Sequence, residues 1–157
     1  MIKSKLLFAF YGLVVGIVVS MFFFGDMIET ANYFKDENIL TSWQDKTTKA
    51  YLYEKPGVAI WALKNFIDIL EERQERLDST RSDLNQIDLA LSYGRLALIW
   101  EKNGNTDKYE IYLNKGYLIA KQCLSKRVKT KEDLLSFIHK TDSIEKKRFD
   151  TQNQEAQ

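Results

Sequence analysis

The chain has 157 residues, a formal net charge of +1 at pH 7, and 29% charged against 45% hydrophobic residues. This composition is typical of a globular protein, and the net charge does not point to any class of partner. About 130 residues follow an apolar N-terminal run, which is enough for one domain with one core and too few for two ordinary domains. The single cysteine, Cys123, excludes an intramolecular disulfide.

Leu6–Phe24 is a run of nineteen residues without a charge. As a helix it would extend about 28 Å, close to the ~30 Å hydrocarbon thickness of a bilayer. We therefore predict a transmembrane anchor over residues 1–25. The alternative is a secretory signal cleaved near Val18-Val19-Ser20, but the apolar run is longer than the usual ~7–15-residue signal core.

The charges on either side of this run predict its orientation. Lys3 and Lys5 precede it, whereas Asp26 and Glu29 follow it. Basic residues near a membrane span are retained on the cytoplasmic side. We expect a single-pass membrane protein with its N-terminus in the cytoplasm and its body in the periplasm or outside the cell.

Within the predicted span, Gly12 and Gly16 are four residues apart. Small residues at this spacing let two membrane helices approach closely, which would allow homo-oligomers to form through the anchor. Glycine is also common in membrane helices that pack only against lipid. Both interpretations stay open for this pair.

The body is predicted to be all-α. Apolar residues recur at helical spacing in a juxtamembrane segment over 26–55, and again after Pro56, which suits the first turn of a helix extending to about Asp78. Ser79 to Ser82 is interpreted as a turn, with Ser82 as a cap for a helix over residues 84–102.

Two further helices complete the predicted body. Thr106 can cap a helix over residues 107–124, and Thr130 with Asp133 can cap a last helix ending near Arg148. These helices assign residues 56–148 to one helical domain. Residues 149–157, ending TQNQEAQ, are predicted to be a disordered tail.

A short turn, Asn103-Gly104-Asn105, joins two of these helices and forces them antiparallel. From Ala90 to about Lys121 the chain resembles a tetratricopeptide repeat hairpin, on Tyr93, Leu96, Ala97, Trp100, Gly104, Leu113 and Gly116. The resemblance implies an antiparallel helical bundle or short α-solenoid. It also implies a concave surface that holds a peptide or a neighbouring subunit.

Aromatic residues supply the predicted partner surface. Tyr109 and Tyr112 stand where a tight hairpin would prefer small residues, and Tyr117 follows on the same helix. Tyrosine buries much area while keeping a polar group, so it is enriched at binding surfaces. We expect these three tyrosines to line a groove that accepts a segment of a protein partner.

Basic residues from Lys121 to Lys131 are not interrupted by any acid. They would complement the negative end of the preceding helix, or alternatively bind anionic lipid or an acidic partner. Nucleic acid is not expected as a partner, because this segment would lie outside the cytoplasm.

We find no pattern that predicts catalysis, a metal site or a cofactor. His139 is the only histidine, no Gly-rich phosphate loop precedes a Lys-Ser or Lys-Thr pair, and no Gly-x-Ser-x-Gly elbow occurs. An enzyme would need Glu72, Glu75 or His139 to converge with another polar group. We predict instead a membrane-anchored interaction or scaffold protein that tethers a protein partner at the outer face of the cytoplasmic membrane. The alternative is a secreted helical binding or inhibitor protein released by signal cleavage.

Overall fold

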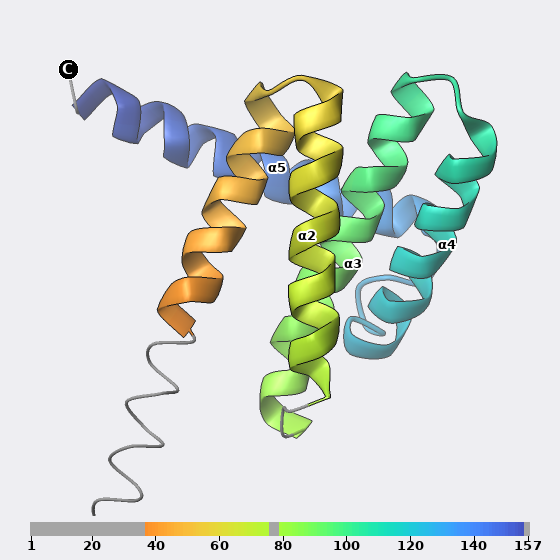
Figure 1. Cartoon of the computed structure of the whole chain (residues 1–157). Helices are drawn as coiled ribbons and strands as arrows, with labels where there is room; N and C mark the ends of the chain where they lie inside the picture. The colour runs from red at the N-terminus through yellow and green to blue at the C-terminus, as the bar shows by residue number, and fades with distance from the viewer. Residues whose placement is uncertain (1–36, 76–78, 156–157) are drawn as a thin grey trace, which may run out of the picture. The chain divides into compact units, whose positions relative to one another are not determined.

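A computed structural model of the chain describes residues 37–75 and 79–155 (Figure 1). Within these ranges the secondary structure is helical and contains no strand, which confirms the all-α prediction. The predicted anchor, with Gly12 and Gly16, lies outside the described residues. None of the helices in the described ranges combines the length and the apolar character needed to cross a membrane.

The described elements are a helix over residues 37–53 and four labelled helices. The labelled helices are α2 (Pro56–Gln74), α3 (Ser79–Lys102), α4 (Thr106–Cys123) and α5 (Lys131–Glu155). The chain divides into two units, Met1–Ser42 and Trp43–Gln157, and the contacts among the helices described below all lie within the second unit.

In the second unit α3 lies between α2 and α4, and α5 crosses behind these helices (Figure 1). α3 is buried almost all along its second half, as expected for a helix with neighbours on several sides. The core is built from large apolar side chains that are almost completely inaccessible to solvent: Leu63, Leu70, Leu96, Leu113, Leu134, Ile138 and Phe149.

The turn between α3 and α4 forms as the sequence predicts. Gly104 has φ +71°, a left-handed conformation that side-chain-bearing residues rarely adopt. The cap is one residue earlier than predicted, because the Asn105 side chain, rather than Thr106, accepts a hydrogen bond from the Lys108 N–H at 3.0 Å. Asparagine is at least as good a cap as threonine.

The start of α3 also differs from the prediction. The helix begins at Ser79, so Ser82 lies inside its first turn and does not cap it. Residues 79–82 contain neither proline nor glycine, and serine and threonine are tolerated in a helix that packing stabilises. The predicted turn therefore becomes helix.

α3 and α4 approach each other closely at Gly116. A Cβ placed on Gly116 would lie 3.0 Å from the Ala90 carbonyl oxygen and 3.2 Å from the Gly94 backbone nitrogen. Both neighbours are backbone atoms, so neither can swing aside. The spacing of the hairpin depends on glycine at this position.

We expect Gly116→Ala to lower the free energy of unfolding by about 1–3 kcal/mol, because the added methyl forces the two helices apart. Gly57→Ala is the matched control, since a Cβ on Gly57 meets no atom within 4 Å. In that open helical position alanine should raise stability by about 0.5 kcal/mol. Urea unfolding followed by circular dichroism measures both; a Gly116→Ala protein as stable as the parent would contradict the close approach.

The start of α5 agrees with the sequence prediction. The Asp133 N–H donates to Thr130 Oγ1 at 3.2 Å, and Asp133 Oδ2 accepts from the Lys129 and Thr130 N–H groups at 2.9 Å each. The two side chains thus bond reciprocally across the first turn, as in a capping box. These hydrogen bonds lower the pKa of the Asp133 carboxyl.

The end of α5 does not agree with the prediction. The helix continues past Arg148 to Glu155, so a disordered tail from residue 149 is wrong over residues 149–155. The physical reason is Phe149, whose side chain is only 1% exposed. Burying this ring stabilises the polar turns around it, although those turns show no apolar stripe of their own.

Candidate functional site

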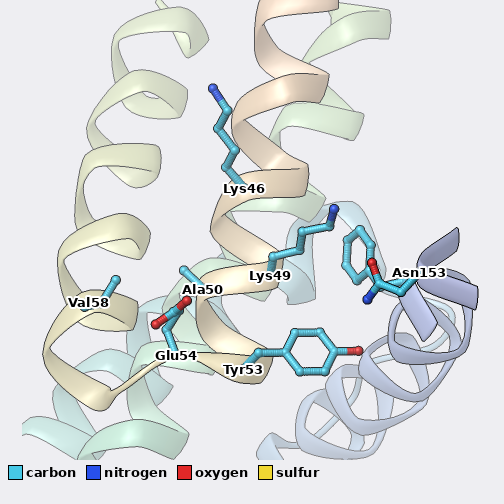
Figure 2. Close-up of a pocket in the computed structure, with 8 residues that line it drawn as sticks. Lys46, Lys49, Ala50, Tyr53, Glu54, Val58 and Asn153 are labelled. Carbon is cyan, nitrogen blue, oxygen red and sulfur yellow. The ribbon is translucent and has the colours of Figure 1, made fainter. Parts of the chain in front are cut away.

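An open groove of about 500 Å³ lies where three helices meet (Figure 2). The end of the helix over 37–53 contributes most of its lining, α2 contributes its first turn, and α5 contributes its last turns. The lining residues are Lys46, Lys49, Ala50, Tyr53, Glu54, Val58, Phe149 and Asn153. The volume falls within the ~300–1,000 Å³ range of ligand pockets.

One side of the groove follows from the local sequence around Ala50 and Pro56. Ala50 is small and lies in the middle of the lining, with longer side chains one helical turn before and after it. Pro56 then begins α2 after a break at residues 54–55, which brings Val58 across from Ala50 (Figure 2). Because the Ala50 side chain is short, space remains between it and Val58 of α2, and this space is part of the groove.

Two lysines make one part of the groove positive. Lys46 and Lys49 lie one turn apart on the same helix, and both are exposed. Lys49 Nζ lies 4.8 Å from the centroid of the Phe149 ring, a cation–π distance. Glu54, in the break just after the same helix, also lines the groove (Figure 2).

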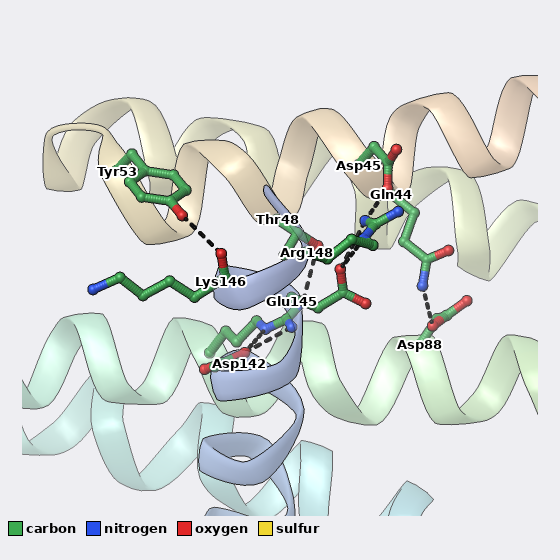
Figure 3. Close-up of polar contacts among 10 residues, drawn as sticks. Gln44, Asp45, Thr48, Tyr53, Asp88, Asp142, Glu145, Lys146 and Arg148 are labelled. Atoms are coloured by element: carbon green, nitrogen blue, oxygen red, sulfur yellow. Dashed lines mark hydrogen bonds and ion pairs between the residues drawn. The ribbon is translucent and has the colours of Figure 1, made fainter. Parts of the chain in front are cut away.

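Tyr53 ties the groove to α5. Its hydroxyl donates to Asp150 Oδ1 at 2.8 Å. Arg148 strengthens the same junction, because its guanidinium pairs with Asp45 at 2.6 Å and with Glu145 at 2.7 Å (Figure 3). The shape of the groove therefore depends on the position of the last turns of α5.

A buried ion pair fixes α5 more strongly. Arg95 of α3 donates through Nε and Nη2 to Asp142 Oδ1 of α5, at 2.9 and 2.7 Å, and both residues are at least 90% buried. Arg95 Nη1 also lies 3.3 Å from Thr48 Oγ1 (Figure 3). This buried junction joins the helix over 37–53, α3 and α5.

Tyr51 belongs to the same junction. The Arg95 guanidinium carbon lies 5.4 Å from the centroid of its ring. Burial raises the pKa of the Tyr51 hydroxyl, and the Asp142 carboxylate raises it further.

The three tyrosines predicted to bind a partner are half-buried on α4. Tyr112 stacks on Tyr93 with ring centroids 6.2 Å apart, and the Tyr117 hydroxyl donates to the Lys129 carbonyl at 2.7 Å. Burial raises the pKa of Tyr109. All three pack against the core, so much of their surface is used inside the fold. Their role in binding a partner stays a prediction.

The residues considered for catalysis are exposed: Glu72 in the last turn of α2, Glu75 directly after that helix, and His139 on α5. In residues 37–75 and 79–155, no three His, Cys, Asp or Glu side chains gather as metal ligands. Cys123 is half-buried, its thiol donates to the Ile119 carbonyl at 3.4 Å, and burial raises its pKa. A raised pKa disfavours the reactive thiolate.

Sequence reasoning did not identify the groove or the buried junction. One signal for the junction is present in the sequence, since Arg95 stands alone within the apolar stretch Leu89–Trp100. A lone arginine among buried residues requires a carboxylate partner, because an unpaired buried charge is very costly. The groove offers no comparable signal, because its lining is spread from Lys46 to Asn153.

No protein-family model matches the chain, and no match was found among curated proteins or solved structures. The tetratricopeptide resemblance of residues 90–121 stays a prediction. Function is therefore argued from the residues and their geometry.

Proposed function

We propose that the chain is a membrane-anchored helical interaction protein that tethers a protein partner at the outer face of the cytoplasmic membrane. The uncharged run Leu6–Phe24 would hold it in the bilayer, and the helical body would present the binding surface. Confining a binding site to the membrane raises the effective concentration of whatever it captures.

The groove is the observation that carries this proposal. It is open, it combines an apolar lining with exposed lysines, and the buried Arg95–Asp142 pair fixes the helix that closes it. Preorganised concave surfaces of this kind bind with less loss of conformational entropy than flexible ones. The tyrosines of α4 offer a second surface for the same role.

Carbonate extraction tests the anchor. We expect the full-length chain to stay in the membrane pellet with its N-terminus intact. Release into the soluble fraction with a shortened N-terminus would instead support the alternative, a secreted helical binding or inhibitor protein.

Affinity capture from solubilised membranes tests tethering. The full-length chain and a version that keeps only residues 1–36 should be compared side by side, with the same detergent and tag. We expect partner proteins to be recovered only when the body is present. Equal recovery by both versions would contradict the proposed role of the body.

A further inference from the structure

We infer that the groove lined by Lys46, Lys49, Ala50 and Val58 binds an acidic amphipathic segment of a partner protein, with apolar side chains over Ala50 and Val58 and carboxylates at the two lysines. This inference rests on the proposed function and specifies the chemistry of the partner.

Charge complementarity selects an acidic occupant. Within the described part of the chain, no carboxylate forms an ion pair with Lys46 or Lys49. Arg148, an exposed cation next to Phe149 in the chain, is already paired with Asp45 and Glu145. The two ammonium groups are therefore available to carboxylates of an incoming chain.

The apolar lining selects an amphipathic occupant. Among the apolar lining residues, Val58 is 46% exposed although it lies on a helix packed against the body, Ala50 is 9% exposed, and the Phe149 ring is buried. An amphipathic helix that lays its apolar face in a groove would cover this surface. Trp61, one turn beyond Val58 on α2 and 61% exposed, would extend the contact.

Glu54 gives the groove a polarity. It lies just past the end of the helix that carries Lys46 and Lys49, so opposite charges lie at different points along the lining. A bound segment would place its carboxylates beside the lysines and neutral or basic residues beside Glu54. Reversed orientation would bring like charges together, which is unfavourable.

A binding titration with defined peptides tests this inference. The probe is a fluorescent synthetic helix of repeated Leu-Leu-Glu-Glu units, about four turns long, and its control has glutamine in place of each glutamate. The full-length chain in detergent should bind the acidic probe more tightly than the control. The affinity for the acidic probe should fall as salt screens the lysines.

The variant Lys46→Glu/Lys49→Glu should lose about tenfold in affinity for the acidic probe, whereas Lys46→Arg/Lys49→Arg should retain it. The matched control, Lys102→Glu/Lys140→Glu, makes the same charge change at exposed residues that neither line the groove nor belong to the basic run from Lys121 to Lys131, and should leave affinity unchanged. Circular dichroism verifies that every variant is folded.

Three results would overturn the inference. The first is equal affinity for the acidic and glutamine probes, and the second is an equal loss in both charge-reversed variants. The third is lysine-dependent binding to vesicles of phosphatidylcholine with phosphatidylserine but not to the peptide, which would assign the groove to lipid. The chain could also stay in the membrane pellet and capture its partner equally well with Lys46→Glu/Lys49→Glu. That result would reject the groove as the binding site while leaving the proposed tethering function intact.

Discussion

Asp142→Ala is expected to lower the free energy of unfolding by about 3–5 kcal/mol. The substitution leaves the Arg95 guanidinium buried without its carboxylate partner, and Arg95 is only 5% exposed. The contacts that remain, to the Thr48 hydroxyl at 3.3 Å and to the Tyr51 ring at 5.4 Å from its centroid, are with neutral groups and cannot replace an anion. Urea unfolding of the full-length chain in detergent, followed by circular dichroism, measures the loss.

The double variant Arg95→Met/Asp142→Leu distinguishes the cost of leaving one buried charge unpaired from the cost of losing the whole ion pair. With both charges removed and similar volumes retained, stability should return to near the parent value, because apolar residues often replace a buried ion pair without loss. If Asp142→Ala alone shifted stability by less than about 0.5 kcal/mol, as surface substitutions do, the buried junction would be contradicted.

Phe149→Ala is expected to cost about 3–5 kcal/mol, since truncating a buried phenylalanine removes its transfer free energy and leaves a cavity. Phe149 also lies beneath two cations, Lys49 and Arg148, at 4.8 and 4.5 Å from its ring centroid. Unfolding of the full-length chain measures the total, and hydrogen exchange in the last turns of α5 should show that region opening first.

Ile144→Ala is the matched control for Phe149→Ala. Ile144 is a large apolar residue on the same helix, but its side chain is 60% exposed. We expect its replacement to change stability by less than about 0.5 kcal/mol. If both variants were equally mild, the end of α5 would behave as the disordered tail that the sequence predicts.

Local chemistry explains which parts of the fold were predictable. The left-handed turn at Gly104, proline at the start of α2, and the reciprocal Thr130–Asp133 bonds each depend on residues a few positions apart. Helical periodicity is equally local, so the presence of each helix could be inferred. Where the prediction failed by one residue, at Asn105, two good capping residues are adjacent, and where it failed by one turn, at Ser79, the predicted turn is part of the helix.

Contacts between distant segments explain why the other features could not be predicted from the sequence. The sequence after Arg148 is polar and has no apolar stripe that would predict a helix. One buried ring, Phe149, holds this stretch against the body, and it contacts Lys49 from a distant part of the chain. The Arg95–Asp142 pair joins residues 47 positions apart. The groove exists only once α5 is in place, so no window of sequence contains it.

The same division between near and distant contacts predicts an order of folding. α3 and α4 meet across a three-residue turn, so little chain entropy opposes their pairing. α5 must close a much longer loop to bring Asp142 to Arg95, and contacts of large sequence separation form slowly. We expect the α3–α4 hairpin to form first and α5 to dock on it last, so that a partly synthesised chain would already hold the hairpin but not the groove.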